Sequence, residues 1–296
     1  MKKSIYITGA SGFVGTSLIQ HLGAAYFFKP YNRIESVEIK EEIVIHLAGK
    51  AHDLKNTTEE EEAYYHANTE LTQTIYDAFL ASDANVFIYL SSVKAVADKV
   101  EGTLTEETPP NPITHYGKSK LLAEKYIFSK LIPANKRVYV LRPCPIHGPG
   151  NKGNLNLLFK MVEKGIPWPL AAFENRRSFC SIQNVIFAIQ ELIEREDIAS
   201  GTYNIADDEA LSTNDLICLI GEAIGRKSNL LKLPQPFIRK LAKLGDIIHL
   251  PLNTERLEKL TESYVVSNNK LATQIGKNFP ISSRDGLKNT FKSFNN

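Results

Sequence analysis

The sequence has few cysteines, and their arrangement excludes two classes of small protein. Cys144, Cys180 and Cys218 stand far apart in a chain of 296 residues, and none belongs to a Cys-x-x-Cys pair. An odd, scattered set predicts neither a disulfide framework nor a zinc site, so we expect no bound metal. Such cysteine usage is typical of a reducing compartment, and no signal peptide is visible, so we predict a cytoplasmic location.

The sequence also lacks an excess of charge and a long apolar run. A net charge of +2 gives no argument for a nucleic-acid partner. No apolar run approaches the ~20 residues that a membrane-spanning helix needs, so we expect no membrane span. The 43% hydrophobic and 23% charged residues are those of an ordinary globular protein. The length allows one large domain or two smaller ones.

A strand, a glycine-rich turn and a helix are predicted in succession at the start of the chain. Residues 4–8 form an apolar run, Gly9, Gly12 and Gly15 follow, and apolar residues then recur with helical spacing. In this context the first glycine makes the tight turn, the second admits a pyrophosphate, and the third allows close helix–strand packing. The pattern therefore predicts a dinucleotide site at a helix N-terminus.

Further apolar runs alternate with helical patterns and predict a doubly wound parallel sheet. The predicted strands cover residues 25–28, 43–47, 86–90 and 137–141, and the predicted helices cover 59–81 and 116–130. His46 is interpreted as a packed strand residue. Ala48 and Gly49 follow one strand and Ser92 follows another, at the strand ends where such sheets place their sites.

The end of the second predicted strand leaves the choice between NAD and NADP open. Many NAD-binding folds carry an acidic residue there, which binds the adenosine ribose. This chain has none at that place, and Arg33 could pair with a 2′-phosphate instead. Arg33 therefore favours NADP weakly, and an ordinary surface role for it fits the sequence equally well.

Tyr116 and Lys120 lie four residues apart, on one face of a predicted helix. A tyrosine has an ordinary pKa of about 10, and a neighbouring ammonium is expected to lower it. The pair therefore predicts a proton-transfer site. A second Tyr-x-x-x-Lys pair begins at Tyr126 and is turned away along the same helix, so we interpret it as incidental.

The strand–helix alternation changes after Gly150, which predicts a smaller second domain. We expect a nucleotide-binding domain over residues 1–150, with 178–206 returning to it, and a substrate domain over 151–177 and 207–296. Residues 237–249 predict a basic amphipathic helix with Arg239, Lys240 and Lys243 opposite its apolar residues. We interpret this helix as packing on its own domain, with contact to a membrane surface as the alternative.

Taken together, the motifs resemble those of the extended short-chain dehydrogenase/reductase family, in its NAD(P)-dependent nucleotide-sugar epimerase/dehydratase branch. The resemblance covers essentially the whole chain, and the joint order and spacing of the motifs make it specific. They are Thr8-Gly-Ala-Ser-Gly-Phe-Val-Gly15, His46-Leu-Ala-Gly49, Asn68-Thr69, Tyr89-Leu-Ser-Ser92, Tyr116-Gly-Lys-Ser-Lys120, Leu141-Arg-Pro143, His147-Gly-Pro149 and Gly201-Thr-Tyr-Asn204.

The resemblance implies a role for each matching residue and a Rossmann-like fold with a smaller C-terminal α/β substrate-binding domain. Ser92, Tyr116 and Lys120 match the catalytic residues. The implied cofactor-binding residues are Gly9, Gly12, Phe13, Val14, Gly15, Arg33, Leu47, Ala48, Gly49, Tyr116, Lys120 and Pro143. The implied substrate-binding residues, which would hold the nucleotide diphosphate, are Asn154, Leu155, Arg177 and Arg256.

The resemblance implies an enzyme that uses NAD or NADP, and the departures from the family pattern narrow its reaction. Val93 and Lys94 follow Ser92 where sugar dehydratases carry an Asp-Glu pair, so dehydration is disfavoured. Pro145 stands where some 4-epimerases carry a sugar-contacting Asn. We predict epimerisation at C4 of a UDP-hexose or UDP-N-acetylhexosamine, with an NADPH-dependent 4-keto-sugar reductase as the alternative. A non-catalytic NAD(P)-sensing regulator fits less well, because the catalytic set is retained. The family also implies a homodimer.

Overall fold

The computed structural model describes residues 2–34, 36–51, 58–151, 153–248 and 253–295. A parallel sheet with the strand order β2-β1-β3-β4-β6-β9 forms the larger lobe. Its strands are β1 (Ser4–Thr8), β2 (Phe27–Pro30), β3 (Ile43–His46), β4 (Val86–Leu90), β6 (Arg137–Pro143) and β9 (Gly201–Ile205). The predicted doubly wound fold is confirmed, because the order reverses direction between β1 and β3.

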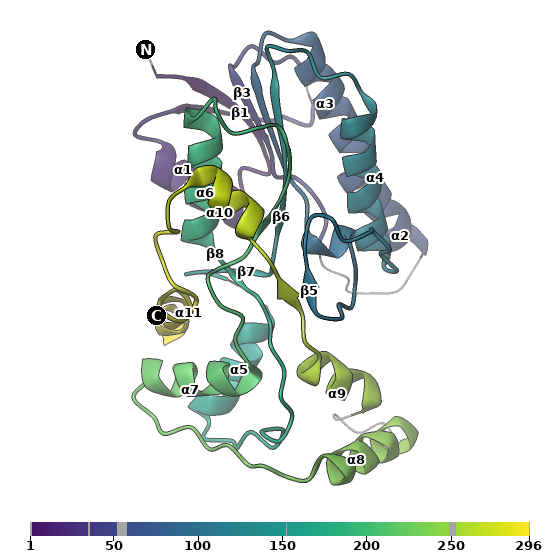
Figure 1. Cartoon of the computed structure of the whole chain (residues 1–296), viewed down its shortest axis with the longest axis vertical. Coiled ribbons are helices and arrows are strands. Elements are labelled where there is room, and N and C mark those ends of the chain that lie inside the picture. The colour runs from purple at the N-terminus through teal and green to yellow at the C-terminus, as the bar shows by residue number, and fades with distance from the viewer. Residues whose placement is uncertain (1, 35, 52–57, 152, 249–252, 296) are drawn as a thin grey trace.

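Helices cover both faces of the sheet because its strands are apolar on both faces. Ile5 and Ile7 face one layer, and Tyr6 and Val44 face the other. The first layer contains α1 (Phe13–Leu22), α6 (Ile182–Glu194) and α10 (Asn269–Ile275). The second contains α3 (Leu71–Ala81) and α4 (His115–Ser129), which lie side by side in Figure 1.

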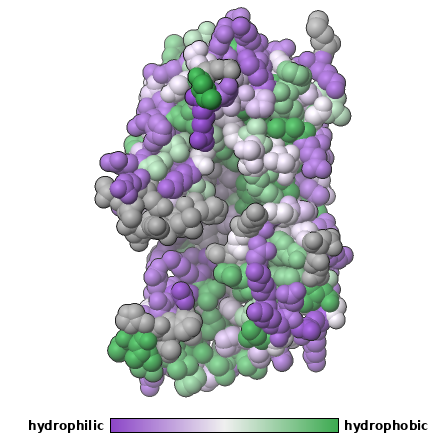
Figure 2. Space-filling model, turned by 180° about the vertical axis from the view of Figure 1, so that it is seen from behind, coloured by the Kyte–Doolittle hydropathy of each residue, from purple (hydrophilic) through white to green (hydrophobic). Residues whose placement is uncertain are grey.

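The smaller lobe has its own apolar cluster, which lies below the sheet in Figure 1. Its helices are α5 (Asn154–Glu163), α7 (Thr213–Ala223), α8 (Gln235–Ile248), α9 (Thr254–Thr261) and α11 (Ser283–Lys292). Four short strands pair outside the main sheet: β5 (Thr103–Leu104) with β10 (Val265–Val266), and β7 (Ile146–His147) with β8 (Cys180–Ser181). Figure 2 shows the surface hollowed between the two lobes.

Two predicted elements differ from the structure. The second strand begins at Phe27 instead of residue 25, because the Ala25 and Tyr26 amides donate to the Leu22 carbonyl at 2.9 and 3.0 Å and close the turn after α1. The single helix predicted over 59–81 consists of α2 (Thr58–Tyr65), a π-helical turn η1 (His66–Glu70) and α3. The sequence analysis did not identify α9, α10 and α11.

Residue 249, the last of the predicted basic helix, lies outside the described residues, and so do residues 250–252. No helix in the part of the chain that the structure describes is both long enough and apolar enough to span a bilayer.

Candidate active site

The glycine turn after β1 has the close backbone packing that requires glycine. Gly9 has φ +69°, and a Cβ on it would lie 2.8 Å from the Ala48 amide nitrogen. A Cβ on Gly15 would lie 2.8 Å from the Cα of Ala10. Gly12 is the N-cap of α1, and among the described residues no side chain caps that helix. The first amides of α1 are therefore available to an anion, which fits the pyrophosphate of a dinucleotide.

The segment after β3 lies between the glycine turn and Lys120, which was predicted to be catalytic. A Cβ on Gly49 would lie 2.6 Å from Asn68 Oδ1 and 3.0 Å from Lys120 Nζ, so a larger residue there would have to displace these two side chains. The Ala48 amide donates to the Thr8 hydroxyl at 3.1 Å. The structure thus places Ala48 and Gly49 between the glycine turn and Lys120. The cofactor-lining role of these residues remains a prediction.

His46 belongs to a buried chain of hydrogen bonds and is not placed to act as an acid or base. The Thr72 hydroxyl donates to the Asn68 carbonyl at 2.6 Å, so its oxygen accepts from His46 Nε2 at 2.9 Å. Nδ1 then accepts from the Thr8 hydroxyl at 2.6 Å. Burial lowers the pKa of His46 to about 3, which keeps the ring neutral. The chain fixes the ends of β1 and β3 against the π-helical turn.

The π-helical turn η1 directs the Asn68 side chain between the loop after β3 and helix α4. Asn68 Nδ2 donates to the Lys50 carbonyl at 3.0 Å and to the Ser119 hydroxyl at 2.9 Å. Its Oδ1 accepts from the Lys50 amide at 2.8 Å. A π-turn inserts one residue into a helix and is frequent at functional sites. Here it positions the loop after β3 relative to the helix that carries Tyr116.

Ser92 and Tyr116 meet at the carboxyl edge of the sheet. Ser92 follows β4, and Tyr116 lies in the first turn of α4, which the Thr114 side chain caps by accepting from the Gly117 amide at 3.2 Å. Burial raises the pKa of Tyr116, and the nearby Ser92 side chain opposes that effect. The structure therefore places two of the predicted catalytic side chains close together.

Lys120 is buried beneath the tyrosine, and its effect on Tyr116 differs from our expectation. We expected the ammonium to lower the pKa of Tyr116, but the opposing contribution in the structure comes from Ser92. Lys120 Nζ instead donates to the Leu90 carbonyl at 2.9 Å and lies 4.8 Å from the centre of the Tyr89 ring. Burial lowers the pKa of Lys120 to about 8, and the Glu124 carboxylate opposes this shift.

A buried ion pair supports Lys120 from the next helical turn. Glu124 follows Lys120 by four residues, and Arg142 Nε donates to its two carboxylate oxygens at 3.0 and 3.2 Å. The Ser91 hydroxyl also donates to Glu124. The sequence analysis missed Glu124 and Arg142. Arg142 lies inside the quoted motif Leu141-Arg-Pro143, and Glu124 lies one helical turn beyond the end of the motif that closes with Lys120.

The remaining predicted cofactor residues lie around the same edge of the sheet. Phe13 and Val14 begin α1 and pack on the sheet core, and Leu47 follows β3. Pro143 ends β6 and is buried. Arg33 lies in the turn after β2 and is exposed. Phe13, Val14, Leu47 and Pro143 therefore belong to or pack against the core, whereas Arg33 does not. Contact of these residues with a cofactor remains a prediction.

The predicted substrate residues lie in the smaller lobe or at its border. Arg177 Nη2 pairs with Glu262 Oε1 at 2.7 Å, so a diphosphate would have to share or displace this partner. Asn154 is the first residue of α5. The Leu155 side chain is buried in the apolar cluster of that lobe, so Leu155 could contact a ligand only through its backbone. Arg256 lies in α9 and is exposed.

Lys94 reaches from the catalytic loop to the border of the smaller lobe. Its ammonium donates to the Asp98 carbonyl at 2.8 Å and lies 4.2 Å from the centre of the Tyr264 ring. Burial lowers its pKa, and the charges of Glu262 and Arg177 also act on it. A cation thus lies at the border between the two lobes, and the prediction that dehydration is disfavoured remains a prediction.

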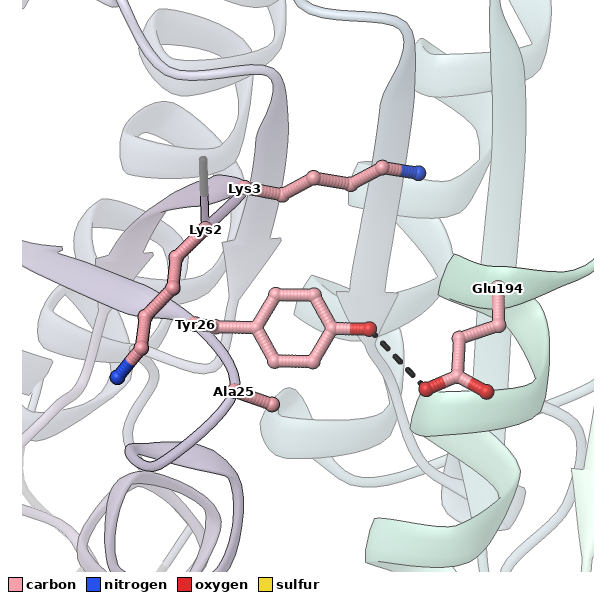
Figure 3. Close-up of a pocket in the computed structure, with 5 residues that line it drawn as sticks. All are labelled: Lys2, Lys3, Ala25, Tyr26 and Glu194. Atoms are coloured by element: carbon pink, nitrogen blue, oxygen red, sulfur yellow. Dashed lines mark hydrogen bonds between the residues drawn. The ribbon is translucent and has the colours of Figure 1, made fainter.

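The pocket drawn in Figure 3 lies away from this site. Its volume is about 610 Å³, and it is lined by Lys2, Lys3, Ala25, Tyr26 and Glu194. The Tyr26 hydroxyl donates to Glu194 Oε1 at 3.2 Å, and burial raises the pKa of Tyr26 to about 12. Lys2 and Lys3 precede β1, so the cavity lies at the amino edge of the parallel sheet, opposite Ser92 and the glycine turn.

A family model matches more than half of the chain, from residue 30 to residue 206, and its description is the NAD dependent epimerase/dehydratase family. The chain belongs to that family. This epimerase/dehydratase is therefore an enzyme, as predicted, and its cofactor is NAD or NADP. The glycine turn precedes the matched residues.

Three relatives differ in the reactions that their names state. The UDP-glucose 4-epimerase of Vibrio cholerae is 27% identical, over 99% of this epimerase/dehydratase and 96% of that protein. The N-acetyl-alpha-D-glucosaminyl-diphospho-ditrans,octacis-undecaprenol 4-epimerase of Escherichia coli O157:H7 is 26% identical, over 80% and 77%. The GDP-6-deoxy-D-mannose reductase of Pseudomonas aeruginosa is 26% identical, over 75% and 80%.

A solved structure has the same fold. The UDP-glucuronic acid 4-epimerase of Bacillus cereus, in complex with NAD, superposes on this epimerase/dehydratase with a TM-score of 0.75 at 20% identity. The alignment covers 99% of this chain and 98% of that one. The likeness confirms the predicted Rossmann-like architecture with its smaller C-terminal lobe.

Proposed function

We propose that the protein epimerises C4 of a nucleotide-diphosphate hexose or N-acetylhexosamine, UDP being the nucleotide of the first relative named above. The observation that carries the proposal is the placement of Ser92 beside Tyr116, with Lys120 buried one helical turn from the tyrosine. This arrangement serves proton transfer to and from one hydroxyl group.

The protein's own residues would bind the substrate, orient it and move one proton. Tyr116 would take the proton of the C4 hydroxyl and return it after the sugar has turned, and Ser92 would hydrogen-bond the same oxygen. Bringing a phenol from a pKa of about 10 to 7 requires about 4 kcal/mol of differential stabilisation. Lys120, buried one helical turn from Tyr116, and a bound cationic nicotinamide are the proposed sources of this stabilisation. Bound NAD or NADP supplies the hydride chemistry.

The diphosphate of the substrate would be held in the smaller lobe. Arg177 presents a guanidinium whose fork matches phosphate geometry, and the first amides of α5 follow Gly153. Arg256 would add a second cation from α9. In this proposal residues 1–150 and 178–206 bind the cofactor, and residues 151–177 and 207–296 bind the substrate.

A reductase is the second candidate, in which NADPH would reduce a 4-keto sugar once. Arg33, in the turn after β2, could pair with a 2′-phosphate, and one of the relatives named above is a reductase. Tyr116 would then donate its proton to the new C4 oxygen. The two candidates differ in whether the cofactor stays bound between turnovers.

The identity of the bound cofactor separates the two candidates. Freshly purified protein is denatured, and the released nucleotide is identified by mass spectrometry. We expect stoichiometric NAD, together with interconversion of UDP-glucose and UDP-galactose or of their N-acetyl analogues without added cofactor. Protein that contains no nucleotide and binds NADPH more tightly than NADH would overturn the epimerase in favour of the reductase.

We also propose a cytoplasmic homodimer. Cys144 and Cys180 are buried free thiols and Cys218 is an exposed one, which suits a reducing compartment. The dimer would form through the outer faces of α3 and α4, where Leu122 and Phe128 are exposed.

A further inference from the structure

Helix α8 packs on the smaller lobe through a narrow apolar stripe. Ile238, Ala242 and Gly245 are buried, and their spacing of three to four residues places them on one face. Ile238 and Ala242 join the apolar cluster of the lobe, and α8 contacts α9. This part agrees with the expectation that the basic helix packs on its own domain.

A second group of apolar side chains on α8 remains exposed. The exposed fractions are 52% for Phe237, 47% for Leu244, 73% for Ile247 and 55% for Ile248. At about 100° per residue, Phe237, Leu244 and Ile248 fall within roughly 40° of one another, beside the buried stripe. Figure 2 shows an apolar patch at the lower end of the smaller lobe, where Figure 1 places α8. The helix is therefore apolar well beyond the face that its own lobe covers.

The polar side of α8 is positively charged. Arg239, Lys240 and Lys243 are exposed, and the one acidic residue of the helix is Asp246. The Thr254 amide donates to Asp246 at 3.0 Å, so this carboxylate is already engaged at the start of α9. Exposed apolar side chains and a row of cations thus lie next to each other on the surface of one helix.

The position of Lys240 favours a lipid surface over a protein surface as the partner. On the helical wheel Lys240 falls about 60° from Phe237, inside the exposed apolar arc. The cores of protein interfaces are depleted in lysine. At a bilayer surface, a lysine instead lies along the apolar region with its stem and reaches a phosphate with its ammonium. We propose that α8 docks the protein on an anionic phospholipid membrane, lying in the plane of the interface.

The docking helix lies in the lobe that we propose binds the diphosphate. Helix α9, which α8 contacts, is followed by Glu262, and Glu262 pairs with Arg177 at 2.7 Å. In a docked protein, the residues that we propose bind the substrate diphosphate would therefore lie in the lobe that faces the membrane. A diphospho-sugar carried on a membrane lipid would be within reach there, an extension that rests on the proposed function.

The test measures sedimentation of the full chain with vesicles. Phosphatidylcholine vesicles with and without phosphatidylglycerol are compared, with no sugar substrate present. We expect the protein to sediment with the anionic vesicles and to be released by salt, which screens the cations. The double variant Leu244→Ser/Ile247→Ser should bind at least tenfold more weakly, because two aliphatic side chains would no longer be partly withdrawn from water on docking. Lys240→Gln/Lys243→Gln should bind roughly tenfold more weakly.

A matched control removes an exposed leucine from the other lobe. Leu131 is 91% exposed just after α4, and Leu131→Ser should bind vesicles as the wild type does. All the substituted side chains are exposed, so the variants should keep the thermal unfolding of the wild type. Failure to sediment with anionic vesicles at low salt would overturn the proposal, as would α8 variants that bind like the wild type.

A self-association surface is the remaining alternative, and light scattering without lipid detects it. If Leu244→Ser/Ile247→Ser lowers the molar mass of the protein, α8 contacts a second copy and the membrane proposal is wrong. The vesicle assay needs neither cofactor nor turnover. Its failure therefore leaves the proposed epimerase untouched, and inactivity on sugars would leave the docking result standing.

Discussion

At the residue scale, the acid–base properties of the candidate site depend on the neighbours of its polar side chains. The Ser92 side chain lies beside Tyr116 and acts on its pKa, and Lys120 donates to the Leu90 carbonyl. The tyrosine therefore keeps a raised pKa in the protein alone. Glu124 and Arg142 do not reach Tyr116 and act through Lys120, so they are positioning residues.

Replacing Tyr116 by Phe should abolish turnover while cofactor binding remains. The change removes the one hydroxyl that we propose moves the C4 proton, so kcat should fall by about 10²- to 10⁴-fold. Cofactor content after purification and kcat on the UDP-sugar pair are the measurements. Full activity in Tyr116→Phe would contradict the assignment of the acid/base.

Replacing Glu124 by Gln should shift the alkaline limb of the pH–rate profile. The carboxylate raises the pKa of Lys120, whose value is about 8, so its removal lowers that pKa further. If activity requires the ammonium, activity should be lost at a lower pH than in the wild type. Unpairing the buried Arg142 should also cost on the order of 3–5 kcal/mol of stability.

Glu124→Asp, which keeps the charge, is the matched control for this shift. It should retain the alkaline limb near its wild-type position even if some stability is lost. If the alkaline limb of the pH–rate profile lies at the same pH in Glu124→Gln as in the wild type, the ion pair has only a structural role.

At the scale of elements, the site depends on strand ends held together by buried polar chains. Thr8 at the end of β1 and Thr72 in α3 bond the two ring nitrogens of His46. Asn68, in the π-helical turn, holds the loop after β3 against Ser119 of α4. These bonds join β1, β3 with its following loop, the η1–α3 segment and α4, which are separated in sequence.

The free energy of unfolding should fall in mild acid, because His46 is buried as a neutral ring and takes up a proton only in the unfolded chain. Its pKa is about 3 in the folded protein and 6.5 ordinarily, so only the unfolded chain binds a proton between those values. Stability therefore rises with pH across this window and is lost as pH falls below 6.5. Between pH 7 and pH 5 the loss should be about 2 kcal/mol, measured by urea unfolding.

His46→Leu isolates that contribution from the other titrating groups. The variant should be less stable at pH 7, because Thr8 and Thr72 lose a partner, but its stability should fall less between pH 7 and pH 5. An equal fall in both proteins would show that His46 does not control the acid response.

At the scale of the whole molecule, two of the helices that the structure describes expose several large apolar side chains. One such surface is the exposed arc of α8, and the other is the outer face of α4, where Leu122 is 45% and Phe128 is 44% exposed. The second surface lies beside α3 in the larger lobe (Figure 1). The proposed dimer would cover it and leave α8 free.

Leu122→Asp should convert the proposed dimer into a monomer. A charge buried at the centre of a helix–helix interface costs more than such an interface tolerates. Light scattering at micromolar concentration measures the mass of the wild type and of the variant. Leu157→Asp places the same charge on α5, at a site that is 68% exposed in the smaller lobe, and should remain dimeric. A monomeric wild type would refute the dimer.

Local pattern alone was enough to predict the parallel sheet, the glycine turn and the helix that carries Tyr116 and Lys120. These features depend on apolar periodicity, glycine spacing and residues close in sequence, so the chain itself determines them. Tertiary structure decided the start of β2 at Phe27, the first residue that pairs with β1, whose amide donates to the Lys3 carbonyl at 3.0 Å. It also decided the neighbours of Lys120 other than Glu124, which lies on the same helix. Gly49 and Leu90 approach Lys120 from two other segments, and burial lowers its pKa. The same holds for α8, whose sequence shows an amphipathic helix, while only the packing of the lobe shows how much of its apolar surface stays uncovered.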